Sequence, residues 1–246
     1  MAPTKGYRRG YPTAILVGLE KDRAVLWRVF SHVVKSEKTV TVIGVRSDPK
    51  AAYSFHETIV NAMRPVIREG VRSIILTSPP STSFSEEFLR HVRSHHAWLM
   101  QGANKAVFSC LAGSAATPSE VAALTRTTAF REALSEATSE EAENIVELLE
   151  KRLNSPNQEV LVLYSLEEIE AQVLGAWTAG KPTPEYLLLT DAFLAGSWQK
   201  GRLQRLMQVA SNRSIKTRVV EADSPAGKRL AQLGGAVCIL KPDMSH

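Results

Sequence analysis

Short apolar or β-branched runs alternate with longer amphipathic stretches along this chain, which is the pattern of a mixed α/β fold. In the first half, a helix is expected over residues 51–69 because Phe55, Ile59 and Met63 recur there at helical spacing. Two further helices are expected, one with Ser85 as its N-cap and one opening near residue 117. The strands expected in this half span residues 13–18, 24–30, 38–45, 71–77 and 105–110.

The second half begins with an acidic helix expected from residue 138, whose Ile145, Leu149 and Leu153 should face inward. Strands and helices then alternate. The expected strands span residues 159–164, 186–190, 215–221 and 236–240, and the expected helices 166–177, 199–211 and 224–233. The change in composition before the acidic helix indicates two domains. We predict a basic extension, a first domain and a second domain over residues 1–12, 13–134 and 135–246.

Charge is divided unevenly between these two halves. Residues 1–134 hold 18 Lys and Arg against 10 Asp and Glu, a net charge of +8. Residues 135–246 hold 12 against 15, a net charge of −3, and the two values sum to the +5 of the whole chain. A basic half favours a polyanion such as RNA, whereas an acidic half favours a protein surface.

The first residues of the basic half interleave cations with an aromatic ring, in the order Lys5-Gly-Tyr-Arg-Arg9. Cations of this kind attract phosphates, and a ring such as that of Tyr7 can stack on a base. Two further cations stand in the loop expected after the third strand. The predicted RNA-binding residues are Lys5, Tyr7, Arg8, Arg9, Arg46 and Lys50.

Sequence patterns for catalysis and cofactor binding do not emerge. Gly234-Gly235 precedes an expected strand, whereas a phosphate-binding loop precedes a helix. Glu87, His91 and His95 stand four residues apart on one helix, but the general-base Glu that metalloproteases place between two His is absent. An exposed helix face is the simpler interpretation. We therefore predict no enzyme activity, no metal site and no cofactor.

Membrane association is not expected either. No apolar run approaches the ~20 residues that cross a bilayer. The polar, basic start of the chain offers no apolar stretch that could act as a signal peptide. We expect a soluble protein in the cytoplasm.

Four segments carry a family resemblance. They read Glu159-Val-Leu-Val-Leu-Tyr-Ser-Leu-Glu-Glu-Ile-Glu-Ala171, Pro184-Glu-Tyr-Leu-Leu-Leu-Thr-Asp191, Ser224-Pro-Ala-Gly-Lys-Arg-Leu-Ala-Gln-Leu-Gly-Gly-Ala-Val-Cys-Ile-Leu-Lys-Pro242 and Val71-Arg-Ser-Ile-Ile-Leu-Thr-Ser-Pro79. The first three resemble the last domain of Pelota, a ribosome-rescue relative of the archaeal and eukaryotic class-1 release factors, and the fourth is similar to its central domain. The resemblance implies an RNase H-like first domain and a second domain like the kink-turn-binding ribosomal proteins.

The same resemblance implies partners, namely the ribosome with its RNA and a translational GTPase or the recycling ABC ATPase. It assigns partner contact to the loop residues Ser78, Pro79, Pro80 and Phe84. Pro80 stands where the family has Gly, and it removes a backbone donor. The Gly-Gly-Gln tripeptide of release factors is absent from its expected region, residues 44–50, and the chain begins where Pelota's central domain should.

These observations lead to one main hypothesis and two alternatives. The main hypothesis is a non-catalytic ribosome-binding translation factor that occupies the factor-binding region in rescue, recycling or hibernation. The first alternative is a metal-dependent RNA nuclease, for which Asp22 and Asp48 are the candidate carboxylates. The second is an RNA-binding adaptor that acts away from the ribosome.

Overall fold

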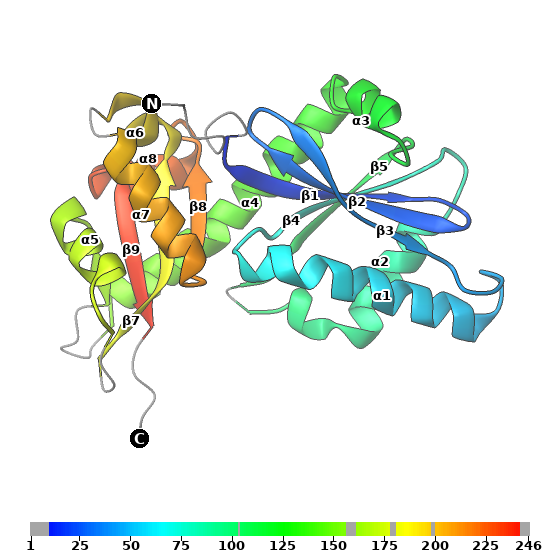
Figure 1. The fold of residues 1–246 in the computed structure, drawn as a ribbon, viewed down its shortest axis with the longest axis horizontal. Coiled ribbons are helices and arrows are strands. Elements are labelled where there is room, and N and C mark those ends of the chain that lie inside the picture. Colours follow the sequence, from blue (N-terminus) through cyan, green and yellow to red (C-terminus); the bar gives the residue numbers. More distant parts are fainter. Residues whose placement is uncertain (1–9, 103, 156–160, 178–180, 198–199, 242–246) are drawn as a thin grey trace. The chain divides into compact units, whose positions relative to one another are not determined.

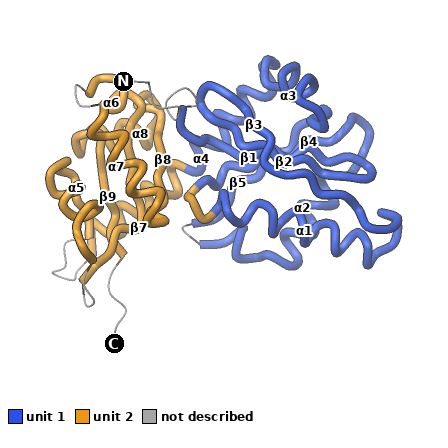
Figure 2. The backbone as a smooth tube through the Cα atoms, viewed as in Figure 1, with its two compact units in different colours: residues 1–67, 71–141 blue, residues 68–70, 142–246 orange. Residues whose placement is uncertain are grey.

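The computed structural model describes residues 10–102, 104–155, 161–177, 181–197 and 200–241 (Figure 1). The chain divides into two compact α/β units. Unit 1 comprises residues 1–67 and 71–141, and unit 2 comprises residues 68–70 and 142–246 (Figure 2). The division falls within helix α4 (Thr128–Leu153), which runs without interruption through the boundary predicted after residue 134.

Unit 1 is built on a five-stranded sheet in the order β3-β2-β1-β4-β5. Its strands are β1 (Pro12–Leu19), β2 (Arg23–Phe30), β3 (Val34–Thr41), β4 (Ser73–Ser78) and β5 (Val107–Ala112). The first three strands form an antiparallel meander, and β4 and β5 extend it in parallel with β1. Five strands were expected in this half, and five are present among the described residues.

Helices cover both faces of this sheet (Figure 1). They are α1 (Pro49–Arg68), α2 (Phe84–His95), the 3-10 helix η2 (Ala97–Leu99), α3 (Pro118–Leu124) and the first part of α4. Successive residues of β1 point to opposite faces, as they do in any strand. Val17 therefore packs with Ile59 of α1, whereas Leu16 packs with Phe130 of α4. The apolar positions predicted for the first helix are buried as expected.

Strand β3 lies four residues earlier than predicted, because its pairing partner ends. Thr41 is opposite Arg23, the first residue of β2, so the alternating residues beyond Thr41 have no neighbouring strand. The chain leaves the sheet there. Ile43 and Val45 are consequently 87% and 68% exposed, although both were expected inside a strand.

The starts of two helices test the predicted caps. The helix expected to open near residue 117 does so at α3, where Thr117 and Glu120 form a capping box. The cap predicted for α2 is wrong, since Ser83 occupies the N-cap position and Ser85 is buried inside the first turn. Lys50 also lies in a helix, the first turn of α1, and not in the preceding loop.

Unit 2 is built on a four-stranded sheet in the order β6-β9-β7-β8. Its strands are β6 (Val162–Leu163), β7 (Thr183–Thr190), β8 (Lys216–Val220) and β9 (Ala236–Lys241). Its helices, besides the end of α4, are α5 (Leu166–Leu174), α6 (Asp191–Gly196), α7 (Lys200–Asn212) and α8 (Pro225–Gln232). The predicted alternation is confirmed, with α6 as an additional short helix.

The sheet of unit 2 also carries a core on each face. Leu188 packs with Leu149 of α4, and its neighbour Leu187 packs with Leu206 of α7 on the opposite face. Leu153, which was expected to face inward, is exposed at the end of α4. The predicted α/β fold class is therefore confirmed for both units. None of the helices in the described ranges is long and apolar enough to span a membrane.

Candidate interaction site around the loop from Ser78 to Phe84

The loop between β4 and α2 contains a tight turn. The backbone N–H and the hydroxyl of Thr82 both donate to the carbonyl oxygen of Pro79, at 3.2 and 2.7 Å. Ser81, the third residue of this turn, has a positive φ of 66°. A Pro in second place and a positive φ in third place are the pattern of a type II turn. Pro80 therefore suits the turn, and the conformation that favours glycine falls on Ser81.

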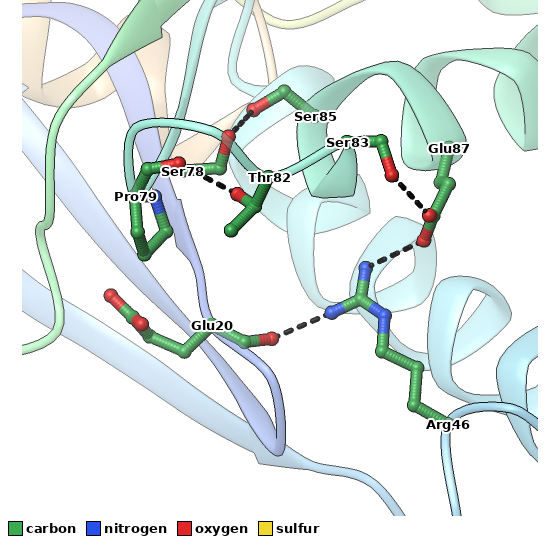
Figure 3. Close-up of polar contacts among 8 residues, drawn as sticks. All are labelled: Glu20, Arg46, Ser78, Pro79, Thr82, Ser83, Ser85 and Glu87. Atoms are coloured by element: carbon green, nitrogen blue, oxygen red, sulfur yellow. Dashed lines mark hydrogen bonds and ion pairs between the residues drawn. The ribbon is translucent and has the colours of Figure 1, made fainter.

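Both ends of the loop are anchored in unit 1. The hydroxyl of Ser85 donates to that of Ser78 at 3.1 Å, and both residues are buried (Figure 3). This bond links the end of β4 directly to the first turn of α2. The turn from Pro79 to Thr82 is thus held from the sheet on one side and from the helix on the other.

Arg46 supports the helical end of the loop. Its guanidinium lies 4.0 Å from the centroid of the Phe84 ring. The same group donates to the carbonyl oxygen of Glu20 at 2.6 Å (Figure 3). A second donor reaches Glu87 at 3.4 Å. Burial lowers the pKa of Arg46, and the nearby carboxylate of Glu87 partly opposes that effect.

These contacts leave the Arg46 side chain only 10% exposed. The guanidinium serves partners within the unit and offers little surface to RNA, and the RNA contact predicted for Arg46 stays a prediction. Glu87 is equally occupied, since it also accepts a hydrogen bond from the hydroxyl of Ser83 at 2.6 Å. The group formed by Arg46, Glu87, Ser83 and Phe84 is called the arginine clamp below.

The predicted partner-binding residues separate into two kinds. Ser78 is buried, and Phe84 lies half-buried beneath Arg46, so these two support the loop. Pro79 is half-buried, and Pro80 is exposed at the turn together with Ser81. A partner that docks on this loop would therefore meet the turn and not its supports.

Several exposed cations lie on the β1–β2 turn and the start of β2, on β3 and at the start of α1. The N–H of Val42 donates to the carbonyl oxygen of Asp22 at 2.8 Å, which joins the turn to the end of β3. Asp48 caps α1 by accepting the N–H of Lys50 at 3.2 Å. These cations, called the hairpin-end cations, are Lys21, Arg23, Lys38 and Lys50.

Other exposed cations of unit 1 lie elsewhere. Arg90 and Arg93 are on α2, and Arg126 and Arg131 are at or near the start of α4. Positive charge is therefore not confined to the hairpin end. The predicted RNA-binding residues Lys5, Tyr7, Arg8 and Arg9 lie outside the described residues.

The predicted exposed face of Glu87, His91 and His95 is not observed. Glu87 belongs to the arginine clamp, whereas His91 is buried and bonds to Glu57 of α1 at 2.9 Å. His95 alone of the three is exposed in the way that was expected. His91 and Glu57 are 34 positions apart in the sequence, so helical spacing gave no signal of their contact.

The two aspartates proposed for a nuclease take part in structural contacts, Asp48 through its carboxylate and Asp22 through its backbone. Asp22 accepts through its backbone carbonyl at the β1–β2 turn, and Asp48 is the N-cap of α1. Within the described ranges, the one group of three or more potential metal ligands contains Glu57, His91 and His96. Neither aspartate belongs to that group.

Two α/β units in series, each with helices on both faces of its sheet and joined through one continuous helix, define the architecture. No family model matches the chain, and no curated protein matches its sequence significantly. Among solved structures, Dom34 of S. cerevisiae, described as a translation termination-like factor that interacts with Hbs1, is similar at 19% identity and a TM-score of 0.50. The match covers 98% of this chain and 66% of that one.

A second similar structure is archaeal Pelota in a ribosome-bound model with ABCE1. It matches at 18% identity and a TM-score of 0.54, over 97% of this chain and 64% of that one. This chain thus spans about two thirds of the length of the structures it matches. At such identities the likeness establishes the fold, which is the one that the sequence resemblance implied.

Proposed function

We propose that this protein is a ribosome-binding translation factor related to Pelota that has no catalytic activity of its own. It would occupy the factor-binding region of the ribosome during rescue, recycling or hibernation. The observation that carries this proposal is the likeness, over 97% of the chain, to Pelota in its ribosome-bound form.

The basic charge of the first half supports contact with ribosomal RNA. Phosphates are attracted by Lys and Arg whatever the sequence of the RNA. The hairpin-end cations are all exposed, and so are the apolar residues Ile43 and Val45 in the segment between β3 and α1. We propose this end of unit 1, together with Lys5, Tyr7, Arg8 and Arg9, as the RNA-contacting region.

The absence of hydrolase activity is proposed from the segment between β3 and α1. Release factors carry Gly-Gly-Gln in this region, whereas here the segment reads Val42-Ile-Gly-Val-Arg-Ser-Asp48. Its one long polar side chain, Arg46, is held by Glu20, Glu87 and Phe84. It is therefore not available to position water at an ester.

The turn from Pro79 to Thr82 is the proposed contact for a translational GTPase or an ABC ATPase. Dom34 is described as interacting with Hbs1, and the ribosome-bound Pelota model includes ABCE1. Pro80 lacks an N–H, so a partner would bind the ring of Pro80 and the hydroxyl of Ser81 in place of a backbone donor.

Unit 2 offers a surface of opposite charge. A groove of about 500 Å³ is lined by acidic residues of α4 and by the start of α8. Its carboxylates are Glu143, Glu147 and Glu150, the last paired with Arg229, and its lining also includes Lys151 and the apolar Val146 and Pro225. We propose that it meets a basic protein surface, because charge complementarity speeds encounter and excludes wrong partners.

The direct test is co-sedimentation of the full chain with purified ribosomes across a series of salt concentrations. A variant with the four hairpin-end cations changed to Gln is compared with a matched variant at Arg90, Arg93, Arg126 and Arg131. If four phosphate contacts are lost, the slope of log affinity against log salt falls by roughly three. The matched variant should keep the slope of the unmodified protein.

Three results would count against the proposal. They are no co-sedimentation at low salt, binding that does not respond to salt, and an equal loss in both variants. RNA cleavage with Mg²⁺ or Mn²⁺ that disappears in Asp22→Asn would favour the nuclease instead. Cross-linking to structured RNA other than ribosomal RNA would favour the adaptor.

A further inference from the structure

Two histidines of unit 1 converge on one carboxylate. The Nε2 atoms of His91 and His96 lie 2.9 and 2.8 Å from the same oxygen, Oε1 of Glu57. Both histidines are buried, whereas the Glu57 side chain is 26% exposed. Two imidazole nitrogens and one carboxylate thus meet at a point that solvent reaches from one side.

The end of α2 explains how residues five positions apart come together. The helix ends at His95, and His96 has non-helical backbone angles of φ −129° and ψ 47°. Its N–H still donates to the carbonyl oxygen of Val92 at 2.8 Å, which fixes the position of the residue. His96 is therefore turned toward Glu57, while His95 remains exposed at the surface.

Aromatic contacts hold the two rings in place. Tyr53, one turn before Glu57 on α1, packs edge-on against His91 with ring centroids 5.1 Å apart. His56 packs on His91 at the same centroid distance, and Trp98 packs edge-on against His96 at 6.5 Å. The two histidine side chains are thus held in place before any ligand binds, which is what a high-affinity binding site requires.

We propose that Glu57, His91 and His96 bind a divalent transition-metal ion, with Zn²⁺ as the best match. Two imidazoles and one carboxylate are a known ligand set for zinc, with a water in the fourth position. The ligand atoms of the three residues all lie within 4.8 Å of one another. The partial exposure of Glu57 gives the ion access and leaves room for that water.

Binding requires the three ligand atoms to adjust their separations. Tetrahedral zinc with bonds of about 2.0–2.1 Å separates its ligand atoms by roughly 3.3 Å. The nitrogen-to-oxygen distances of 2.9 and 2.8 Å would therefore lengthen by about 0.4 Å. The ion would replace the protons that the histidines share with Glu57, and the two imidazole nitrogens, which lie within 4.8 Å of each other, would adopt the same separation.

The ion would connect α1 to α2, since Glu57 lies on the first helix and both histidines lie on or directly after the second. An ion that binds only the folded protein raises the midpoint of thermal unfolding. The site lies within unit 1 and does not depend on ribosome binding. A failure of one proposal therefore leaves the other standing.

The experiment uses the full chain, first stripped with EDTA and then titrated with ZnCl₂ by calorimetry. We expect one Zn²⁺ per chain and a higher unfolding midpoint. Glu57→Gln and His96→Gln should each weaken binding at least about tenfold, the lower end of what the loss of a supporting group causes. His95→Gln is the matched control, because His95 is a neighbour outside the ligand group, and it should bind as tightly as the unmodified protein.

A second measurement keeps the proposal open to refutation if a variant fails to fold. In the unmodified chain, paramagnetic Co²⁺ should shift the ring resonances of His91 and His96 and leave exposed His32 unchanged. The proposal is overturned by the absence of stoichiometric Zn²⁺ binding, by equal affinity in Glu57→Gln, or by a Co²⁺ effect on His32 without one on His91.

Discussion

The guanidinium carbon of Arg46 lies 4.0 Å above the centre of the Phe84 ring, and this contact joins two residues that the sequence assigned to different tasks. Arg46 was expected to bind RNA and Phe84 to bind a protein. Both instead hold the start of α2 against the β1–β2 turn, where Arg46 also donates to the carbonyl oxygen of Glu20. The loop offered to a partner is thus supported by its own unit.

Replacing Arg46 with Lys should lower the free energy of unfolding by about 2 kcal/mol, because Lys cannot donate to Glu20 and Glu87 while covering Phe84. Urea denaturation of both proteins measures the difference. The control is Lys50→Ala, an exposed position, which should stay within about 0.5 kcal/mol of the unmodified protein. Equal stability of Arg46→Lys and the unmodified chain would show that the clamp contributes nothing.

The left-handed backbone of Ser81 predicts a selective response to substitution. Its φ is 66°, a conformation that costs a β-branched residue roughly 1–2 kcal/mol. Ser81→Val should therefore be destabilised by about that amount, whereas Ser81→Gly should not be destabilised. Thermal unfolding of the two variants side by side makes the comparison. A greater loss in the Gly variant than in the Val variant contradicts the turn described here.

Ser73 of β4 donates its hydroxyl hydrogen to the carboxylate of Glu141, which is only 2% exposed. Removing that donor with Ser73→Ala should cost about 1–3 kcal/mol, because a buried carboxylate loses part of its solvation. Glu140→Gln, at the exposed neighbour of Glu141, provides the control and should change stability little. Chemical denaturation measures the stability of both variants, and Ser73→Ala should be the less stable of the two.

The stability of unit 2 is expected to depend weakly on pH. The hydrogen bond from Arg229 lowers the pKa of Glu150, against a smaller opposite effect of burial. A carboxylate with a lowered pKa stabilises the fold above its unfolded-state pKa, and this contribution is lost as the pH falls through the folded-state value. Both side chains are 37% exposed, so salt screens the pair and the effect is small.

The measurement is urea denaturation of the unmodified protein and of Arg229→Gln between pH 6 and pH 3. The difference in stability between them should shrink as the pH falls below about 4. Raising the salt concentration at pH 6 should shrink it as well. A stability difference that grows toward low pH would contradict the stabilising role given to the Arg229–Glu150 pair.

Much of the fold followed from the sequence, because alternation and helical spacing are local properties. The burial of Phe55, Ile59 and Met63 in α1 is one example. The boundary after residue 134 was placed by the change in composition before the acidic helix, although neither Gly nor Pro interrupts residues 128–153. That uninterrupted stretch was the available signal for the single helix α4.

The parts of the site that escaped prediction depend on contacts between distant residues. Arg46 meets Glu87 across 41 positions, and His96 meets Glu57 across 39. Spacing within α2 pointed to His95, because nothing in the pattern signalled that the helix ends there and turns His96 toward Glu57. The end of β3 likewise depends on which strand pairs with it. The alternation of apolar and polar residues does not reveal that pairing.

The early end of β3 leaves three consecutive positions, Ile43 to Val45, outside both the core and the arginine clamp. Mutations of Ile43 and Val45 can change chemistry while leaving the architecture intact, whereas the φ of 98° at Gly44 favours keeping a glycine between them. Grafting a glutamine-bearing release-factor sequence at these positions would ask whether this bend can support ester cleavage. Its folding should survive the exchange.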